Sequence, residues 1–361
     1  MKQGSTFLLF ASMTPFVIAL GVACGDPQEP RMPTAPTASA PMVVTPLASA
    51  RTPAPPPVDS TPRPPEPPLS EKQLASLSTA TEAMNAHDLN RYAELFTKNV
   101  IHKEAAAQDI RGRNEMNMRM GLLFKAFPDF KFQFERVWQK DSVAVATWTW
   151  TGTDSGGYIE RKPTNRRAGL SGITVGFFNA DGAIREVHFY ADGATLASQL
   201  DPKAKAGSFR AVPADPTGGK PRATVSNNGD EEVKALAASK AFYDALEQKD
   251  KGALAALVTD DMTVDDLAAA PRAEKGKAAG DALIADWTKT FGSFSDLPLY
   301  NQVAVGSTVI VERVLSGKMS GRPVKLHALD LLEVRDGKVA KLIVYSDTLE
   351  LWHQAGPTAH R

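Results

Sequence analysis

The sequence contains a single cysteine, Cys24, among its 361 residues. An intrachain disulfide is therefore excluded, and so is a metal site built from cysteines. The chain also lacks an excess of charge of either sign, because 41 Lys and Arg residues balance 41 Asp and Glu residues. A nucleic-acid-binding protein normally presents a basic surface, so no nucleic-acid partner is expected.

Several motifs of cofactor-dependent and nucleophilic enzymes are missing as well. The sequence has no His pair at metal-binding spacing, no HExxH, no phosphate-binding loop, no nucleophile elbow and no glycine-rich dinucleotide turn. We therefore expect no metal and no cofactor. A hydrophobic content of 43% and a charged content of 23% are ordinary for a globular protein, and the length predicts two domains or one large one.

One stretch of the sequence occurs twice. Residues 181–200, DGAIREVHFYADGATLASQL, resemble residues 336–355, DGKVAKLIVYSDTLELWHQA. The ungapped alignment pairs Gly182 with Gly337, Tyr190 with Tyr345, Asp192 with Asp347 and Gln199 with Gln354. A repeat of this kind indicates two copies of one domain.

The N-terminus has the pattern of an export signal over residues 1–24. Lys2 gives a positive start, residues 7–22 are mostly apolar, and Cys24 follows. An apolar run before a small residue and Cys resembles the lipobox of bacterial lipoproteins, which implies lipidation of Cys24 and a membrane-anchored protein of the bacterial envelope. The alternative is ordinary signal cleavage, which would give a secreted or periplasmic protein.

Two stretches have the composition of linkers. Residues 25–70 hold 15 of the 26 prolines amid Ala, Thr and Ser, a composition that favours an extended polyproline II tether rather than a packed core. Residues 206–230 are rich in Pro, Gly and Asn. These stretches divide the chain into domain one, residues 71–205, and domain two, residues 231–361.

Both domains show the same succession of patterns. In domain one, apolar residues at helical spacing over 71–86, 89–96 and 112–127 predict three helices, and period-2 alternation afterwards predicts strands over 130–137, 143–151 and 168–178 and a closing strand after a hairpin turn at 179–182. In domain two, helices are predicted over 231–248, 251–258 and 281–291, followed by strands over 299–305, 307–315, 324–334 and 338–346. Three helices followed by a run of strands indicate an α+β fold with the helices on one face of an antiparallel sheet.

Domain one resembles the SnoaL-like polyketide cyclases, which belong to the nuclear transport factor 2-like superfamily. The residues that carry the resemblance are Phe127-Pro128-Asp129, Thr151-Gly152-Thr153, Asp181-Gly182, Ile184, Glu186, Asp192 and Gln199-Leu200. Domain two shares the Asp-Gly turn, Tyr345, Asp347 and Gln354-Ala355-Gly356 but lacks a Thr-Gly-Thr loop. The resemblance implies two cone-like (cystatin-like α+β roll) domains, each with about three N-terminal helices packed on a curved antiparallel sheet. Because domains of this superfamily often dimerise through their sheets, it also implies an intrachain pseudo-dimer or a homodimer.

Four side chains of the closing strand share one face, because alternate residues of a strand point the same way. They are Glu186, His188, Tyr190 and Asp192. The resemblance implies that this face lines a pocket and that Asp192 is a general acid or base, since cyclases of this type use an aspartate near this place. We therefore expect Asp192 and His188 to be catalytic and Tyr190 and Glu186 to line the ligand pocket.

Three residues elsewhere in domain one are expected to line the same pocket. His102 lies near the first strand, and Trp148 and Trp150 share one face of a later strand. The alternatives are an exposed strand edge for His102 and a domain interface or plain core for the two tryptophans. The equivalents of the pocket residues in domain two are Asp347 and Tyr345.

A structural role for Asp192 is the alternative to catalysis. Asp192 precedes Gly193 and an apolar helical segment, so its side chain is well placed to cap that helix. Domain two keeps the aspartate, as Asp347, but has lost the histidine and the glutamate of this face. An aspartate that persists without its presumed partners favours the cap.

Two functions follow from these observations. The first is an exported, envelope-associated protein that binds a small hydrophobic molecule in the domain-one pocket, with cyclase- or isomerase-like acid–base chemistry by Asp192. The second is a tethered ligand-binding or assembly module without turnover. A pocket that contains Asp192 would favour the first function, and an Asp192 bonded to backbone amides would favour the second.

Overall fold

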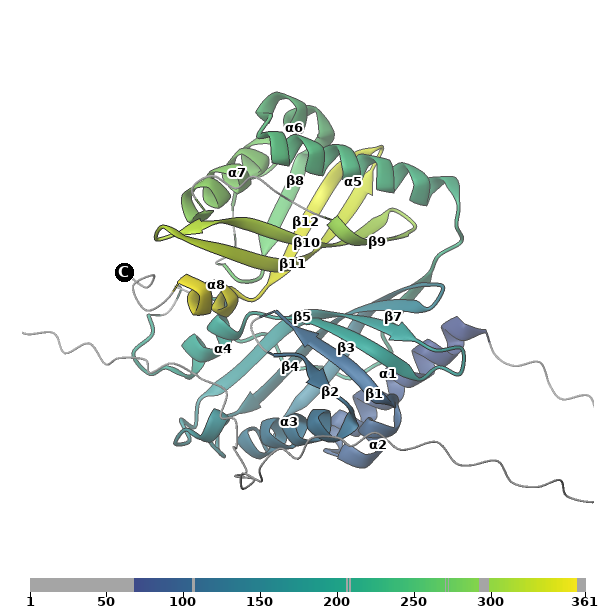
Figure 1. Ribbon diagram of the computed structural model, residues 1–361, viewed down its shortest axis with the longest axis vertical. Helices are drawn as coiled ribbons and strands as arrows, with labels where there is room; N and C mark the ends of the chain where they lie inside the picture. The colour runs from purple at the N-terminus through teal and green to yellow at the C-terminus, as the bar shows by residue number, and fades with distance from the viewer. Residues whose placement is uncertain are drawn as a thin grey trace, which may run out of the picture. The chain divides into compact units, whose positions relative to one another are not determined.

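The computed structural model describes residues 68–105, 108–205, 207, 209–269, 271, 273–291 and 299–355. All of them belong to one compact unit that spans Pro64–Arg361 (Figure 1). The predicted signal segment, Cys24 and nearly all of the proline-rich stretch lie outside the described residues, so their roles stay predictions. No described helix is long and apolar enough to span a bilayer.

Domain one follows the predicted order of helices and strands. Its elements are α1 (Leu69–Asn85), α2 (Leu89–Glu94), β1 (Phe96–Glu104), β2 (Ile110–Arg111), α3 (Arg113–Ala126), β3 (Lys131–Lys140), β4 (Val143–Thr153), the short 3₁₀ helix η1 (Tyr158–Glu160), β5 (Arg167–Phe178), β6 (Ile184–Tyr190) and α4 (Gly193–Leu200). In α1, Leu77, Ala80 and Met84 are buried at the helical spacing that predicted the helix. Gly182 turns the β5–β6 hairpin with a positive φ of 87°, which suits glycine.

Domain two repeats this plan. Its elements are α5 (Asp230–Gln248), α6 (Lys251–Leu257), β8 (Val258–Asp266), α7 (Lys277–Phe291), β9 (Leu299–Val305), β10 (Thr308–Met319), β11 (Arg322–Arg335), β12 (Lys338–Ser346) and α8 (Thr348–Ala355). The α+β class with two domains, each with helices packed on a sheet, is confirmed (Figure 1).

The two sheets are mixed rather than purely antiparallel. Their strand orders are β2-β1-β6-β5-β4-β3-β7 in domain one and β8-β12-β11-β10-β9 in domain two. The strands that follow one another in hairpins pair antiparallel, as predicted, but β1 runs parallel to β6 and β8 runs parallel to β12. The first strand of each domain reaches its partner only after the intervening helix and hairpins, a non-local pairing that local patterns do not reveal.

The stretch predicted as the second linker contains a strand. β7 (Arg222–Val225) pairs in parallel with β3 and extends the sheet of domain one at its edge. Side-chain contacts also hold the predicted linker against both domains. Asp215 accepts hydrogen bonds from Thr151 and Arg167 of domain one, and Arg210 pairs with Asp265 of β8 in domain two. All four β7 residues are exposed, which is why their composition resembles a linker.

The buried side chains form three clusters rather than two. One fills domain one between its sheet and helices α1–α3, and one fills domain two between its sheet and helices α5–α7. The third joins the other faces of the two sheets, and its members are Trp138, Val145, Ile173, Val175, Tyr190, Val305, Ile310, Leu329, Leu331 and Tyr345. Each sheet is therefore covered on both faces, and we call the third cluster the junction core.

Candidate functional site at the junction of the two sheets

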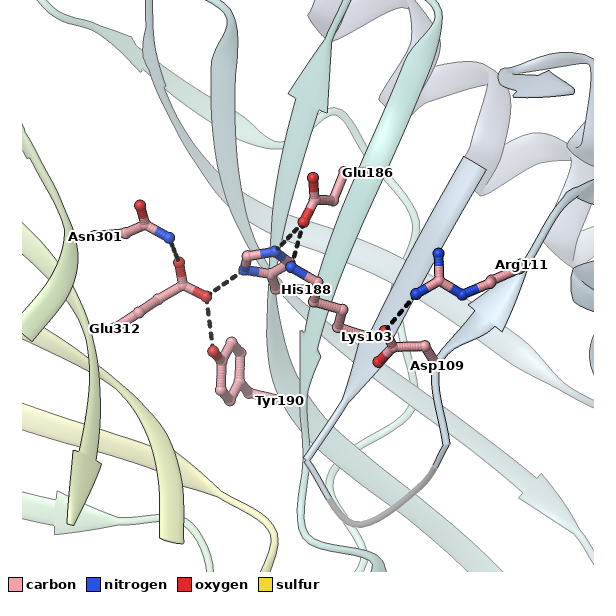
Figure 2. Close-up of polar contacts among 8 residues, drawn as sticks. All are labelled: Lys103, Asp109, Arg111, Glu186, His188, Tyr190, Asn301 and Glu312. Carbon is pink, nitrogen blue, oxygen red and sulfur yellow. Dashed lines mark hydrogen bonds and ion pairs between the residues drawn. The ribbon is translucent and has the colours of Figure 1, made fainter. Parts of the chain in front are cut away.

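The polar side chains of β6 share one face, as their alternation predicts, and that face meets domain two. His188 and Tyr190 both contact Glu312 of β10, a residue that sequence reasoning did not single out (Figure 2). The Nδ1 atom of His188 lies 2.6 Å from Oε1 of Glu312, and the Tyr190 hydroxyl donates to the same oxygen over 2.6 Å. Asn301 of β9 donates to Oε2 over 2.5 Å. Tyr190 and Glu186, expected in a domain-one pocket, thus lie at the junction.

The junction contains a chain of alternating charges. Lys103 of β1 lies 2.6 Å from Glu186, and Glu186 lies 2.8 Å from Nε2 of His188, whose other nitrogen contacts Glu312. Burial would lower the pKa of His188, but its hydrogen bond to Glu312 and the charge of that carboxylate outweigh burial and raise the pKa. Burial opposes ionisation of Glu186, yet its hydrogen bonds with Lys103 and His188 lower its pKa. The four groups therefore alternate in sign and compensate one another, as buried charges require.

Asp192 caps two helices. Its Oδ2 accepts hydrogen bonds from the backbone N–H and the hydroxyl of Thr195 in α4, at 2.8 and 2.6 Å. Its Oδ1 accepts from the backbone N–H and the hydroxyl of Thr348 in α8, at 2.9 and 2.7 Å. Both carboxylate oxygens are thus used by helix N-termini, one from each domain.

Asp347 makes the reciprocal arrangement. Its Oδ1 accepts from the backbone N–H of Leu349 in its own helix and from that of Gly193 in α4, both at 3.0 Å. Burial, with the negative charge of Asp192 as a further cause, raises the pKa of Asp347 to about 8. The repeated aspartates therefore form a cross-domain pair of caps, and the persistence of the aspartate in both repeats has a structural reason.

The opposite face of β6 belongs to the interior of domain one. Val187, Phe189 and Ala191 pack in the same cluster as Trp148 and Trp150. Phe189 stacks on Trp148 with ring centroids 4.8 Å apart. The two tryptophans therefore share one strand face, and that face packs in the domain-one interior together with the apolar residues of β6.

His102 is a polar residue of this interior whose side chain lacks hydrogen bonds. Its ring meets Phe189 edge-on at 5.6 Å, and neither ring nitrogen, both of them buried, has a hydrogen-bond partner among the described residues. Burial lowers the pKa of His102, with Glu104, whose carboxylate lies 3.5 Å from Nε2, acting in the opposite direction. His102 is therefore held neutral, with one donor and one acceptor unused.

Two further polar residues of domain one lie near Glu104. Arg119 of α3 lies 4.0 Å from Glu104 and 3.4 Å from Glu115. Tyr158 of η1 packs beside Phe127, and burial raises the pKa of its hydroxyl to about 12, with the charge of Glu104 as the next cause. Arg119 and Tyr158 were missed because nothing in their local pattern distinguishes them from surface residues.

The interior of domain two has a different polar content. Val264 occupies the position of His102, and Tyr345 lies in the junction core. Arg313 of β10 is fully buried and donates to both oxygens of Asp330, which also accepts from the Tyr243 hydroxyl over 2.7 Å. No group of three or more His, Cys, Asp or Glu side chains comes together as metal ligands would, as far as the described chain extends.

Comparisons with known proteins identify both domains. A model of the SnoaL-like polyketide cyclase family matches residues 75–200, and a model of the SnoaL-like domain matches residues 239–342. No curated protein matches the sequence.

Solved structures resemble single domains of the chain. They include a protein from Jannaschia sp. CCS1 described as a SnoaL-like polyketide cyclase, with 17% identity over 39% of this chain and 99% of that one and a TM-score of 0.35. An NTF2-like protein from Burkholderia xenovorans LB400 has 26% identity over 36% and 100%, with a TM-score of 0.31. An LEH-like epoxide hydrolase from M. tuberculosis has 22% identity over 33% and 87%, with a TM-score of 0.29. The two family models, one per repeat, show that the chain carries two SnoaL-like domains in tandem, the first of which belongs to the SnoaL-like polyketide cyclase family.

Proposed function

We propose that this protein is an exported, membrane-tethered ligand-binding module. Domain one holds a small, largely apolar molecule that carries one polar group, and domain two is a built-in structural partner. The observation that carries the proposal is His102, whose two buried ring nitrogens lack partners among the described residues.

An unpaired imidazole in an apolar interior costs free energy, because its donor and acceptor lose their hydrogen bonds to water. Most buried polar groups of folded proteins have a hydrogen-bond partner. A buried polar group that lacks one therefore calls for an explanation, such as a ligand that supplies the partner. A hydroxyl or carbonyl of a ligand would satisfy His102, and the rings of Phe189 and Trp148 offer an apolar surface beside it. Small hydrophobic ligands are common among SnoaL-like domains, which agrees with this chemistry.

The partner role of domain two rests on the junction. The junction core, the His188–Glu312 contact and the reciprocal caps of Asp192 and Asp347 give domain one an intrachain equivalent of a dimer partner. A domain covered in this way needs no second copy of the chain to bury its sheet. The interior of domain two has its own buried ion pair, Arg313–Asp330, in place of an unpaired histidine.

Export and anchoring are supported by the sequence alone. The apolar segment before Cys24 and the proline-rich tether that follows it fit a lipidated protein whose domains stand away from the membrane. A Cys24→Ser variant is expected to leave the membrane fraction for the soluble one. Unchanged membrane association of that variant would contradict lipid anchoring.

Acid–base chemistry by Asp192, with His188, is the second candidate and stays a prediction. In its favour, two carboxyl groups lie together and the raised pKa of Asp347, about 8, is in the range of a general acid or base at neutral pH. Against it, both carboxylate oxygens of Asp192 already accept hydrogen bonds, two from Thr195 and two from Thr348. The ligand-binding proposal therefore assigns no turnover to Asp192.

The test of the binding proposal is native mass spectrometry of the protein purified from its bacterial host. We expect the wild-type chain to retain a small molecule and His102→Val to lose it, because valine stands at this position in domain two. His353→Val, a change of an exposed histidine in α8, is the matched control and is expected to retain the molecule. Equal retention by wild type and His102→Val, or no retained molecule in the wild type, would refute the proposal.

A further inference from the structure

A hollow opens beside Glu312 at the junction. Its volume is about 170 Å³, and both domains contribute to its lining. The lining residues are Val143, Val145, Val175 and Phe177 of domain one and Asn301, Gln302, Val303, Ile310 and Glu312 of domain two. Most of the wall is therefore aliphatic or aromatic, and the polar groups come from domain two alone.

The polar end of the hollow is a buried carboxylate with acceptor capacity left over. Glu312 is 1% exposed. Its Oε1 accepts two hydrogen bonds, from His188 and Tyr190, whereas among the described residues its Oε2 accepts one, from Asn301 (Figure 2). Each carboxylate oxygen has two lone-pair positions, so Oε2 has room for one more donor.

The charge at this end selects the kind of donor. Glu312 and Glu186 carry negative charge, and His188 and Lys103 carry the compensating positive charges. A protonated amine would bring an uncompensated charge into a largely apolar hollow, which is unfavourable. A neutral hydroxyl donates one hydrogen bond without adding charge, so it fits better.

The volume limits the ligand to about one ring. An engineered apolar cavity of about 150 Å³ in another protein holds benzene. From size, wall and polar end together, we propose that the junction hollow is a binding site for a compact neutral alcohol or phenol, its ring against the valines and its hydroxyl donating to Oε2 of Glu312. This site is separate from the His102 site of domain one.

The proposal is tested on the full chain with phenol as the probe and toluene as the probe without a hydroxyl. Methyl NMR of valine- and isoleucine-labelled protein follows the resonances of Val143, Val175, Val303 and Ile310. We expect phenol to shift these methyl signals saturably, with a dissociation constant of about 1 mM or tighter. Toluene is expected to bind about tenfold more weakly, because it leaves Oε2 unsatisfied.

Variants locate the site. Val303→Phe fills the hollow from domain two and is expected to weaken phenol binding at least about tenfold. Val143→Phe fills it from domain one and serves the same purpose if the first variant fails to fold. Val225→Phe, on exposed β7, is the matched control and is expected to bind phenol as the wild type does.

Three results would overturn the proposal. One is the absence of saturable shifts at the hollow methyl groups with phenol, which would mean that the hollow takes only water. The second is equal affinity for phenol and toluene, which would remove the role of Glu312. The third is unchanged phenol binding by a folded Val303→Phe or Val143→Phe variant, which would place the probe elsewhere.

Discussion

Domain one and domain two have the same order of helices and strands but differ in the polar residues of their interiors and in the partners of those residues. Domain one buries a neutral histidine, His102, whose ring nitrogens find no partner in the described chain. Domain two buries a charge, Arg313, and places Asp330 and Tyr243 around it. Among the described residues, His102 thus has no hydrogen-bond partner at either ring nitrogen, whereas Arg313 has a charged partner in Asp330 and leaves only its Nη1 atom unpaired.

The aligned positions of the two repeats fall into two groups, those where the residue is the same and those where it differs. They agree at the two places where they hold each other, since Asp192 and Asp347 cap helices across the junction. They disagree where one of them is proposed to bind a ligand, at His102 and Val264. Agreement at the aspartates thus marks a structural role that the two repeats share, whereas the difference between His102 and Val264 marks a site proposed for one domain.

The largest expected effect comes from the ion pair of domain two. Asp330→Ala leaves the guanidinium of Arg313 buried and unpaired, and we expect the free energy of unfolding to fall by about 3–5 kcal/mol. Urea denaturation measures this loss. The double change Arg313→Met with Asp330→Leu is expected to recover most of it, and Asp244→Ala, at an exposed pair, to change nothing measurable. A small loss of unfolding free energy in Asp330→Ala would mean that the Arg313–Asp330 pair does not stabilise the interior of domain two.

The next effect concerns the caps. Asp192→Ala removes four hydrogen bonds to α4 and α8, and we expect it to cost about 2 kcal/mol of unfolding free energy. Chemical denaturation followed by far-UV circular dichroism measures the change. Thr348→Val, which removes a single one of these donors, is the milder companion and should cost less. Full stability of Asp192→Ala would contradict the capping role and restore interest in Asp192 as an acid or base.

Exchanging the residues at the equivalent positions His102 and Val264 tests the difference between the two interiors directly. In protein freed of ligand, His102→Val is expected to raise the unfolding free energy by about 1 kcal/mol, because an unpaired buried polar group disappears. The reverse change, Val264→His, is expected to lower it by about 1–2 kcal/mol, because it brings a polar ring into the buried position of Val264. Thermal unfolding of both variants tests the pair. Destabilisation by His102→Val would show that His102 has a structural role.

The last prediction is a pH dependence of the stability. The folded-state pKa of Asp347, about 8, lies above the ordinary value of an aspartate, so the stability tied to its protonated form is lost as the pH rises from about 4 to about 8. Asp347→Asn cannot ionise, so the wild type should lose stability relative to this variant across that window. Solvent near the half-buried carboxyl reduces the size of the difference.

Two histidines also contribute to the pH dependence, in opposite directions and on opposite sides of their ordinary pKa of about 6.5. The raised pKa of His188 gives stability that is lost as the pH rises past about 6.5, whereas the lowered pKa of His102 makes stability increase as the pH rises toward about 6.5. Unfolding curves of wild type and Asp347→Asn between pH 4 and 8 isolate the aspartate, because the histidines are common to both. Parallel curves would mean that Asp347 is ionised in the folded protein.

Much of the fold could be predicted because its signals are local. The helical spacing of Leu77, Ala80 and Met84, the alternation in β4 and the Asp-Gly turns each lie within a few residues of sequence, and the repeat tied the two domains together. β7 was missed because its four residues are exposed and lack a pattern, and the parallel pairings of β1 and β8 were missed because their partners are distant in the sequence.

The site could be predicted only in part. The sequence placed Glu186, His188 and Tyr190 on one face of a strand, but it could not tell which body would cover that face. Glu312, which contacts His188 and Tyr190, lies more than a hundred residues away from them and belongs to no recognisable motif. His102 was singled out as a polar residue on a strand, while the absence of a hydrogen-bond partner depends on everything packed around it.

The sequence by itself determined two α+β domains, their order of elements and the side chains that share each strand face, because these follow from turns and from the period of the chain. The tertiary structure alone decided that both faces of each sheet are buried, that Asp192 and Asp347 cap helices across the junction, and that His188 meets a carboxylate of the other domain. The physical reason is that alternation fixes relative orientation along one strand, whereas burial and pairing depend on non-local contacts.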